Sequence, residues 1–598
     1  MNSPIRTRPS QARPSPSRRT GALRAAVLGL LSVALTVAVS ELVAAVGHWT
    51  GVLGPAASPV YSLGTSVIDI SPGWLVEWAK ENLGAPGDKI FLGVGIGVVS
   101  LLFGAGVGVI AAFRWRLAMT STAVLGVAAG SAVLARTESS PVDLLGLVIG
   151  LAAGIAFLHL AFRQPDGRAP SPTTSSAARG AAAAPAAPDG TRRRFVQLVG
   201  LGTFGALVVG GLSRLVPSDA AVTASRAQVV LPPVAGRAGT STSRASSTTA
   251  PSTTEPSTTA PSTTAPSTTA PSTTALPRST SSAIASATPT STIDAATFDT
   301  VKGLSSYVTP NDAFYRIDTA FDVPQIPSAD WSLKIHGLVD TPMEITYEQL
   351  LQMDQTAAMV TLTCVSNPRG GDLVGNALWQ GVRISDVLAM AGTNGGADCV
   401  LSTDKQGWTC STPLVALTDA RDALLAIGMN GEPLPVEHGF PVRMVVPGLY
   451  GYVSATKWVI DLEVTKFSEV MAYWTGLGWS ERGPIKLSSR IDVPGDQASA
   501  GAVTVAGVAW AQHTGVDAVQ IQTDDGSGWG AWQDCELSRP VSLDTWVQWR
   551  TTWQASPGTY KLRCRAIDRF GNAQIAVDSD VLPDGATGYH QITVAVTA

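Results

Sequence analysis

One cysteine of the chain, Cys364, follows an apolar, β-branched run at 359–363, and Asn367 and Arg369 come shortly after it. A strand that ends at this point would hold a thiolate rigidly at the edge of a sheet, beside a hydrogen-bonding amide and a fixed positive charge. A thiolate is a good ligand for a soft metal, and a guanidinium binds oxyanions. A lone cysteine is also commonly just a small buried hydrophobic residue. The rest of the sequence has to decide between a metal ligand and a core thiol.

A second group of polar residues lies in and after the run 438–448, which reads His-Gly-Phe-Pro-Val-Arg-Met-Val-Val-Pro-Gly. Residues 442–446 are predicted to form a strand that carries Arg443 on one face. With His438 before the strand and Lys457 after it, three basic side chains can converge on a phosphate and a heteroaromatic ring. Arginine would act there as a bidentate fork and lysine as a point charge. Taken one at a time, each is equally an ordinary charge at the end of a strand.

The scaffold that must position these residues is the region 296–488, which is predicted to be a mixed α+β domain. Residues 331–337 are predicted to form a strand, and 346–353 a short helix with Thr346 as its N-cap. Residues 382–390 are predicted to form an amphipathic helix, because apolar residues recur there at helical spacing.

The composition predicts membrane spans ahead of this domain. The chain has 598 residues, of which only 14% are charged, and its mean hydropathy is +0.20. An ordinary soluble protein has more charged residues and a lower mean hydropathy. The net charge of -4 gives no reason to expect a nucleic-acid partner. The five apolar runs that we expect to cross a bilayer are 22–47, 90–113, 118–135, 142–162 and 195–212.

Basic residues flank these runs asymmetrically. They lie before the first run, after the second, and between the fourth and fifth, whereas 48–89 and 136–141 carry few. By the positive-inside rule, we expect a multi-pass protein of the cell membrane with a cytoplasmic N-terminus and an extracytoplasmic C-terminal half. The sequence Arg-Arg-Arg-Phe at 192–195 also resembles a twin-arginine export signal, which serves domains that are already folded.

Two ionisable residues lie within these runs, Glu41 late in the first and His159 late in the fourth. Such residues suggest function by default, but both lie near an interface, where side chains reach towards water. His48 and His159 lie at opposite ends of their predicted helices. A haem held between paired histidines is therefore not expected.

Two further regions differ from the rest in composition. Residues 216–295 contain the repeat Ala-Pro-Ser-Thr-Thr, which blocks helix formation and offers no apolar core, so we expect a disordered stalk. Residues 489–598 contain strands that alternate at period two, which is typical of an immunoglobulin-like β-sandwich. The chain has five cysteines, and Cys535 and Cys564 in this last region are either a disulfide or two free thiols. The predicted regions are a disordered basic N-terminus (1–21), a membrane domain (22–215), a linker (216–295), the α+β domain (296–488) and the sandwich (489–598).

From about Tyr307 onward, the chain resembles the sulfite-oxidase family of molybdopterin enzymes. The resemblance is carried by 362–369 (Leu-Thr-Cys-Val-Ser-Asn-Pro-Arg), by 456–458 (Thr-Lys-Trp) and by a long ordered run at 429–443. That run reads Met-Asn-Gly-Glu-Pro-Leu-Pro-Val-Glu-His-Gly-Phe-Pro-Val-Arg.

The resemblance implies a molybdenum-molybdopterin cofactor with Cys364 as the protein thiolate on the metal. It also assigns Arg369 to the neighbourhood of the substrate and Tyr473 to an active-site tyrosine, so that these two and Cys364 form the catalytic set. The residues that the resemblance assigns to the cofactor are Tyr315, Arg316, Asp318, Thr319, Asp404, His438, Arg443, Ala455, Thr456 and Lys457.

The sequence also departs from the sulfite oxidases. They present an Arg-Asn-His triplet where residues 317–319 read Ile-Asp-Thr, and no arginine lies beyond Arg569 to match their C-terminal pocket arginine. A dianion such as sulfite needs several converging cations. The pocket is therefore expected to be less cationic than a sulfite site.

The sequence thus predicts a membrane-tethered, extracytoplasmic molybdopterin-dependent oxidoreductase that performs two-electron oxo transfer on a small substrate. The alternatives are an S-oxide reductase of the same fold and a non-catalytic, stalked interaction module. No haem-binding domain is recognised, so electrons are expected to pass to or from an external partner. The resemblance further implies a homodimer through the C-terminal domain.

Overall fold

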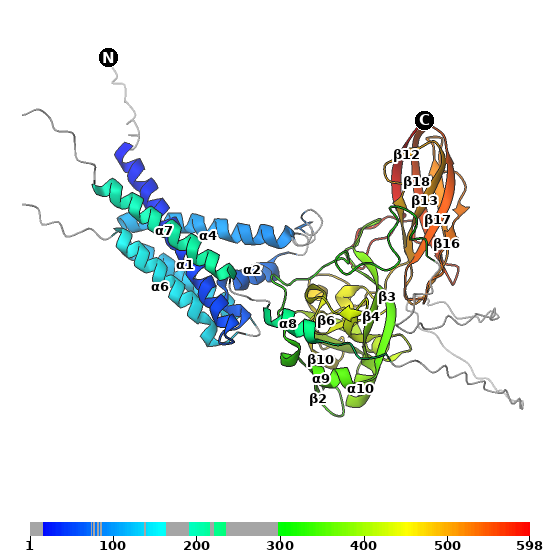
Figure 1. Cartoon of the computed structure of the whole chain (residues 1–598), viewed down its shortest axis with the longest axis horizontal. Coiled ribbons are helices and arrows are strands. Elements are labelled where there is room, and N and C mark those ends of the chain that lie inside the picture. The colour runs from blue at the N-terminus through cyan, green and yellow to red at the C-terminus, as the bar shows by residue number, and fades with distance from the viewer. Residues whose placement is uncertain are drawn as a thin grey trace, which may run out of the picture.

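The computed structural model describes residues 16–72, 75, 78–79, 83, 87–136, 139–162, 190–215, 220–234 and 297–598. A helical part (16–215, the helical domain) lies beside a β-rich part made of two domains (Figure 1). The predicted disordered N-terminus at 1–21 needs correction. Residues 16–21 belong to the first helix, and 1–15 lie outside the described residues.

The helical domain is organised around one long helix, α1, which packs against α4, α6 and α7. Within the described ranges, five helices are long and apolar enough to cross a membrane, as the sequence predicted. Small residues let the helices approach closely: Ser32 Oγ of α1 donates to the carbonyl of Gly154 in α6 at 2.8 Å. The helices of this domain are α1 (Pro16–Trp49), α2 (Pro59–Ile70), α4 (Gly87–Phe113), α5 (Trp115–Leu134), α6 (Leu144–Phe162) and α7 (Gly190–Leu215).

The two ionisable residues inside the apolar runs have structural partners. Glu41 accepts hydrogen bonds from Ser58 Oγ at 2.8 Å and from the backbone N–H of Val60 at 3.1 Å, and so supports the start of α2. His159 packs edge-on against Trp115, with 5.6 Å between ring centroids. Both contacts agree with a structural role.

The cofactor domain (297–487) contains two five-stranded sheets that share one buried core. The first has the order β2-β1-β10-β5-β6, in which β1 runs parallel to β10 and the other pairs are antiparallel. The second has the order β3-β4-β7-β8, with β9 also paired to β7. Its strands are β1 (Ser332–Gly337), β2 (Met343–Thr346), β3 (Gln355–Thr363), β4 (Val374–Arg383), β5 (Cys399–Asp404), β6 (Thr409–Pro413), β7 (Leu424–Met429), β8 (Glu432–Pro433), β9 (Arg443–Val445) and β10 (Val459–Thr465). Its helices are α9 (Tyr347–Gln352), α10 (Ile384–Ala391), α11 (Leu414–Thr418) and α12 (Tyr473–Gly476).

Local signals in the sequence located these elements well. Thr346 caps α9 in a reciprocal capping box with Gln349, as predicted. The helix expected at 382–390 begins only at Ile384, because Val382 pairs with Leu425 in the adjacent strand. Strand pairing here overrides the helical spacing of the apolar residues.

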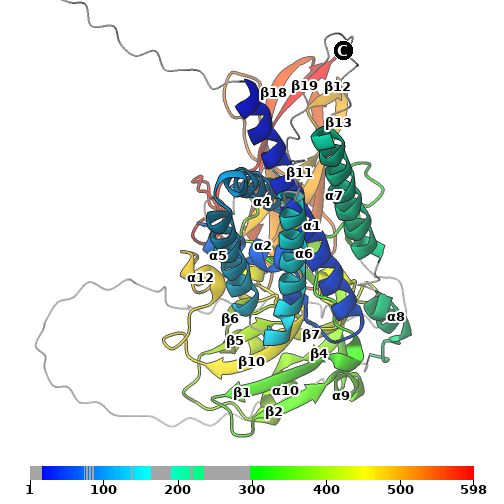
Figure 2. The ribbon, with the colours of Figure 1, turned by 90° about the vertical axis from the view of Figure 1, so that its left-hand side faces the viewer.

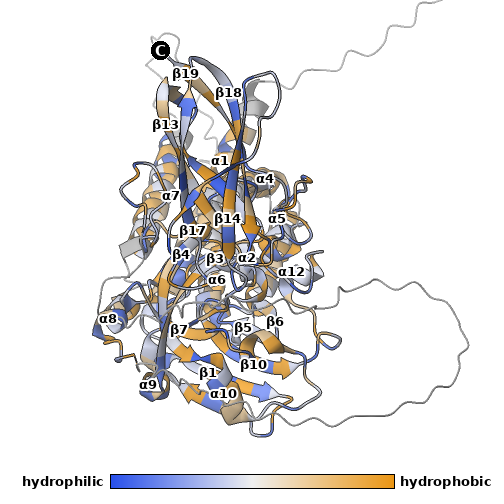
Figure 3. Cartoon of the chain, turned by 90° about the vertical axis from the view of Figure 1, so that its right-hand side faces the viewer, coloured by the Kyte–Doolittle hydropathy of each residue, from blue (hydrophilic) through white to orange (hydrophobic). Residues whose placement is uncertain are grey.

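The C-terminal domain (488–598) is built from two sheets that pack around a common core. One has the order β11-β13-β17-β16 and the other β12-β19-β18-β14-β15. Buried side chains from both, such as Trp549 and Ile521, meet in one cluster. Exposed and buried residues alternate along β18, which Figure 3 shows as alternating hydrophilic and hydrophobic bands. The strands are β11 (Ser488–Val493), β12 (Gln497–Ser499), β13 (Gly501–Trp510), β14 (Val516–Asp524), β15 (Gln533–Asp534), β16 (Glu536–Leu537), β17 (Val547–Ala555), β18 (Gly558–Asp568) and β19 (Gln591–Thr597).

Cys535 and Cys564 are both thiols and are not joined in a disulfide. Cys564 is fully buried and accepts a hydrogen bond from Ser489 Oγ at 3.3 Å. Of the two alternatives that the sequence left open, the structure has the free thiols.

The linker predicted at 216–295 also needs correction. Residues 220–228 form helix α8 (Ala220–Gln228), and 220–234 pack on the cofactor domain rather than forming part of a free stalk. Val222 of this stretch is buried at 1% exposure against the domain. We call residues 220–234 the docking segment; residues 235–296 lie outside the described residues.

Candidate active site

Cys364 comes immediately after β3, as the sequence predicted, and a tight turn fixes it. Its backbone N–H donates to the carbonyl of Leu373 at 2.9 Å, and its own carbonyl accepts from the N–H of Asn367 at 3.1 Å. The side chain of Asn367 accepts from the N–H of Leu373 at 3.0 Å. The amide that sequence analysis placed beside the thiol therefore holds the turn that carries it.

Arg443 lies at the start of β9 with only 5% of its surface exposed. Its guanidinium donates to the carbonyl of His438 at 3.1 Å and lies over the ring of Trp379, with 4.9 Å to the centroid. Burial lowers the pKa of Arg443 to about 10, so the side chain keeps its charge at neutral pH. In the part of the chain that the structure describes, no carboxylate forms an ion pair with it.

His438 is buried beside this arginine. Burial, and then the charge of Arg443, lowers the pKa of His438 to about 4, so its imidazole is neutral at pH 7. Nε2 lies 2.9 Å from the carbonyl of Asn311. Because a carbonyl can only accept, Nε2 carries the proton and Nδ1 is left as an acceptor.

Gly439 makes the close approach of these groups possible. It has φ +112°, a region that favours glycine, and a Cβ there would lie 2.9 Å from Cβ of Arg443 and 3.2 Å from Cβ of Lys457. A side chain at this position would push the two cationic side chains apart.

Asp318 gathers three cations around one buried carboxylate. Oδ2 accepts from Lys457 Nζ at 2.6 Å and from Arg316 Nε at 2.9 Å, and Oδ1 pairs with Lys89 Nζ at 2.5 Å. Burial alone would raise the pKa of Asp318, but the cations, Lys457 first among them, hold it well below its usual value. Burial lowers the pKa of Lys457 to about 8, against the opposing effect of Asp318.

Asp404, at the end of β5, shapes the opposite wall. Its Oδ1 accepts from the backbone N–H groups of Gln406 at 2.8 Å and Trp408 at 2.9 Å. The resulting turn brings the indole of Trp408 to the pocket. Its Nε1 is buried there without a hydrogen-bond partner, so a donor is available for a bound molecule.

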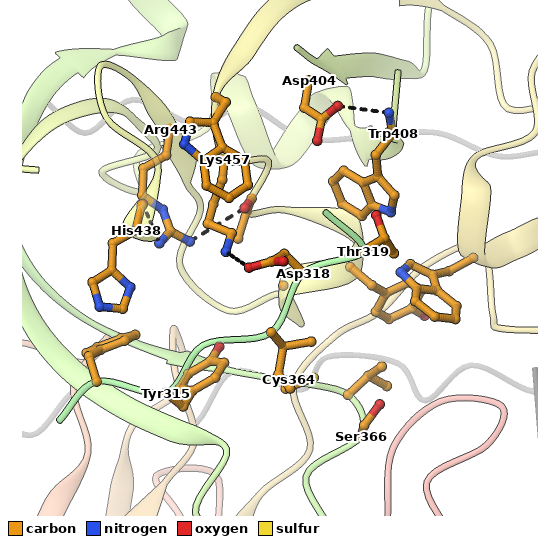
Figure 4. Close-up of a pocket in the computed structure, with 18 of the residues that line it drawn as sticks. Tyr315, Asp318, Thr319, Cys364, Ser366, Asp404, Trp408, His438, Arg443 and Lys457 are labelled. Atoms are coloured by element: carbon orange, nitrogen blue, oxygen red, sulfur yellow. Dashed lines mark hydrogen bonds and ion pairs between the residues drawn. The ribbon is translucent and has the colours of Figure 1, made fainter. Parts of the chain in front are cut away.

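These groups line one pocket, with Cys364 and Tyr315 on one side and the cationic cluster and Trp408 across from them (Figure 4). Nine of the residues assigned by sequence analysis line it: Tyr315, Asp318, Thr319, Cys364, Asp404, His438, Arg443, Ala455 and Lys457.

Four assigned residues are not in the lining. Arg316 lies behind Asp318 and pairs with it, and Thr456 is fully buried and shares a hydrogen bond with Ser402 Oγ at 2.7 Å. Arg369 instead forms an ion pair with Asp578 of the C-terminal domain at 2.7 Å. Tyr473 lies beside the pocket, where burial and then Asp69 of α2 raise its pKa to about 12.

Sequence analysis missed the aromatic walls. Trp474 follows the assigned Tyr473, and Trp408 lies just after the assigned Asp404, so proximity to assigned positions was the available signal. Tyr452 and Trp479 had no such signal. They reach the pocket because their rings pack against each other at 5.8 Å between centroids.

The side chains of the pocket limit the kind of metal cofactor that it can hold. No cluster of three or more His, Cys, Asp or Glu side chains that could hold a metal occurs among the described residues. A metal at Cys364 must therefore bring its other ligands with it. Arg443, Lys457 and the unpaired Nε1 of Trp408 offer positive charge and a donor to an anionic, hydrogen-bonding group. This donor set fits a pterin cofactor that carries a phosphate and supplies its own sulfur ligands.

The fold and the site thus define a molybdopterin-dependent oxidoreductase. Residues 320–474 match the family described as oxidoreductase molybdopterin binding domain. The chain is 36% identical over 186 residues to the uncharacterized oxidoreductase YuiH of Bacillus subtilis, an alignment that covers 30% of this chain and 89% of that protein. It is 28% identical over 337 residues to the sulfite oxidase of Arabidopsis thaliana (45% of this chain, 83% of that protein). It is 28% identical over 316 residues to the mitochondrial sulfite oxidase of Homo sapiens (45% of this chain, 57% of that protein).

The chain therefore belongs to the oxidoreductase molybdopterin binding domain family, as a relative of the sulfite oxidases with molybdenum-molybdopterin as its cofactor. The alignments cover at most 45% of this chain.

Proposed function

We propose that the protein is a membrane-anchored oxidoreductase that carries out two-electron oxo transfer on a small substrate at the extracytoplasmic face. The observation that carries the proposal is the position of Cys364 across one pocket from two buried cations, Arg443 and Lys457. A thiolate alone binds metals of many kinds, and cations alone bind many anions. Together in one pocket they suit a cofactor that has a metal at one end and a phosphate at the other.

The chain's own residues bind and orient this cofactor. Cys364 supplies the single protein thiolate, held by its turn. Arg443 and Lys457 bind the phosphate, and the neutral His438 offers Nδ1 as an acceptor to a donor on the pterin ring. Asp318 keeps Lys457 charged and in place, since it opposes the effect of burial on that lysine. When bound, the cofactor supplies two-electron oxo transfer chemistry.

The substrate end of the pocket favours a substrate of low charge. The lining of the pocket includes Tyr452, Trp474 and Trp479, and the expected substrate arginine, Arg369, pairs with Asp578 instead. Buried aromatic rings bind apolar and weakly polar groups better than dianions. These features support a substrate other than sulfite, the substrate that the names of the Arabidopsis thaliana and Homo sapiens relatives give.

A second candidate, reduction of a neutral S-oxide, is favoured by the same aromatic lining. In that direction, the substrate loses its oxygen as water and takes up two electrons and two protons. In the oxidising direction, water supplies the oxygen, and two electrons and two protons leave. Either direction needs an external electron-transfer partner.

The placement in the membrane rests on the five apolar helices and on the asymmetry of the basic residues around them. A twin-arginine-like sequence before the fifth span would suit the export of a domain that folds around its cofactor in the cytosol. The C-terminal sandwich is proposed to be immunoglobulin-like and to carry a homodimer contact.

The test uses the full chain, purified in detergent from a host that makes molybdopterin. We expect about one molybdenum and one pterin per chain, a one-to-one ratio that follows from a single cysteine ligand. Activity is then assayed with sulfite and an electron acceptor, and separately with dialkyl sulfoxides and a reduced dye. Turnover of sulfoxide but not sulfite supports the second candidate, and protein without molybdenum contradicts the proposal as a whole.

A further inference from the structure

The docking segment (220–234) lies against the part of the cofactor domain that carries His438. Val222 of α8 is buried at 1% exposure in one cluster with Trp379 and with Phe314, which lines the pocket. A valine buried this deeply contributes to holding two surfaces together, because exposing it again costs hydrophobic free energy.

Arg226 adds directional contacts to this apolar one. Its Nη2 donates to the carbonyl of Pro433 at 2.7 Å and its Nε to the carbonyl of Leu434 at 2.8 Å. Pro433 is the last residue of β8, and Leu434 follows it, four residues before His438. The guanidinium also pairs with Glu432 at 3.0 Å, a half-exposed contact that is worth less than the two to the backbone.

The rest of the docking segment continues along the same surface. Gln380 Nε2 of β4 donates to the carbonyl of Pro232 at 2.7 Å. A Cβ on Gly428 would lie 2.8 Å from Leu231, so this leucine fits into a space that only glycine leaves open. Contacts therefore extend from Val222 to Pro232.

The chain length between the helical domain and the docking segment is short. Helix α7 ends at Leu215 and α8 begins at Ala220. The five peptide steps between them reach at most about 18 Å. Residues 235–296, by contrast, could reach on the order of 200 Å if they were extended like polyproline.

Both ends of that longer stretch lie on the β-rich part of the protein. Residue 234 ends the docking segment, and Phe298 is already buried at 7% exposure against Ala506, with its N–H donating to Gln548 Oε1 at 2.7 Å. The described residues at both ends of the stretch 235–296 therefore belong to or pack on the β-rich part, which follows the α7–α8 connection. The length of that stretch cannot set the distance between the helical domain and the active site.

A second contact orients the two parts. Lys89, at the start of α4, pairs with Asp318 of the pocket, and the ring of Phe321 lies 2.8 Å from where a Cβ on Gly64 of α2 would be. Figure 2 shows the helices in front of the β-rich part, with α8 at its edge. The cofactor pocket thus has its Asp318 side towards the helical domain.

We propose that the docking segment, and not the proline-rich repeat, is what ties the catalytic half (297–598) to the helical domain. The residues on either side of the stretch that contains the repeat, 220–234 before it and Phe298 after it, are both held by the catalytic half. The active site then stays within one short connection of the membrane whatever the length of the repeat. The proposal rests on the proposed function only in placing the helical domain in a membrane.

The test cuts the full chain at one of two places. A site-specific protease sequence replaces the repeat unit 260–264 in one version and residues 216–219 in the other, and a tag marks the N-terminus. After cleavage in detergent, the tagged helical fragment is captured and the catalytic fragment that stays with it is measured. We expect retention after the cut at 260–264 and release after the cut at 216–219.

Variants in the version cut at 260–264 test the contact itself. Arg226→Ala should weaken retention roughly tenfold, the equivalent of 1.4 kcal/mol, and Val222→Asp should abolish it. Lys466→Ala, which removes an exposed ion pair with Glu469 that involves no residue of the docking segment, is the control and should change nothing. Circular dichroism of the uncut variants checks that each still folds.

The outcomes separate this proposal from the proposed function. Release after the cut at 260–264 overturns the docking proposal. Retention after the cut at 216–219 overturns it as well, because the contact of Lys89 and Phe321 would then suffice. Capture in detergent needs neither molybdenum, nor turnover, nor a membrane, so failure of the proposed function leaves this result unaffected.

Discussion

Replacing Asp318 with asparagine keeps the shape of the side chain and removes the charge on which three cations converge. Lys457 and Lys89 are 9% and 10% exposed at their side chains, and Arg316 is 26% exposed. An asparagine can still accept one hydrogen bond, but it offers no compensating charge. The variant therefore leaves buried positive charge without a partner.

The expected loss of stability follows from this burial. Removing one partner of a buried ion pair costs about 3–5 kcal/mol. Lys457 limits the loss, because its pKa of about 8 falls further without Asp318, so that it can discharge near neutral pH. We therefore expect the lower end, about 3 kcal/mol, which corresponds to a fall in Tm of roughly 6–12 °C.

The assay is thermal unfolding of the full chain in detergent, followed by near-ultraviolet circular dichroism, with and without cofactor. Asp422→Asn is the matched control, since Asp422 pairs with Arg383 at 2.6 Å with about a quarter of each side chain exposed (27% and 26%). The control should lose less than about 1 kcal/mol. In the loaded protein, the cofactor's phosphate replaces part of the missing negative charge, so the loss should be smaller than in the cofactor-free protein.

Two results would refute this reasoning. One is a Tm of Asp318→Asn that matches the control, which would mean that the three cations do not depend on the carboxylate. The other is a loss of stability that is larger in the loaded protein than in the cofactor-free protein. That result would mean that the cofactor's phosphate does not bind beside these three cations.

Four further predictions concern single residues of the site. Cys364→Ser should fold normally but lose molybdenum by metal analysis, and a fully active variant contradicts the ligand role. Gly439→Ala should lower stability by about 1–3 kcal/mol, since φ is +112° there, and should lower cofactor content, whereas an unchanged Tm would show that the turn can relax. Cofactor retention should fall as pH rises through about 8 or somewhat above, because Lys457 is charged below its pKa of about 8 and neutral above it. Lys457→Arg should remove this pH dependence. A wild-type retention profile that is flat to pH 10 would contradict the role of Lys457. Arg369→Ala should change kcat/KM by less than about twofold, because its pair with Asp578 is largely exposed, and a tenfold rise in KM would return this arginine to the substrate site.

Short stretches of sequence predict much of the local structure of the site. A β-branched run that ends in Cys364, and a His-Gly-Phe-Pro-Val-Arg run with its glycine, specify local turns and a strand whatever lies around them. Their hydrogen bonds and backbone angles join neighbours in the chain, so motif and spacing were enough to predict them. The same holds for the capping box at Thr346 and for the apolar helices, whose composition is itself the signal.

Other features were decided only by packing between distant parts of the chain. Arg369 follows the thiol in sequence, yet its charge is taken by Asp578, more than two hundred residues away. Trp479 lines the pocket together with Tyr452, and the tilted contact between their two rings is not signalled by either local sequence.

Sequence by itself thus determined the family and its cofactor, and it predicted Cys364 as the thiolate ligand and the basic residues that line the pocket, because short motifs carry these signals. Tertiary structure alone decided that Lys89 of the helical domain pairs with Asp318, and that residues 220–234 pack on the cofactor domain although the sequence predicted them to be part of a linker. Composition reports whether a segment can build a core of its own. It does not report whether single side chains of that segment bind the surface of another domain. Here Val222 is buried against the cofactor domain, and Arg226 donates hydrogen bonds to its backbone.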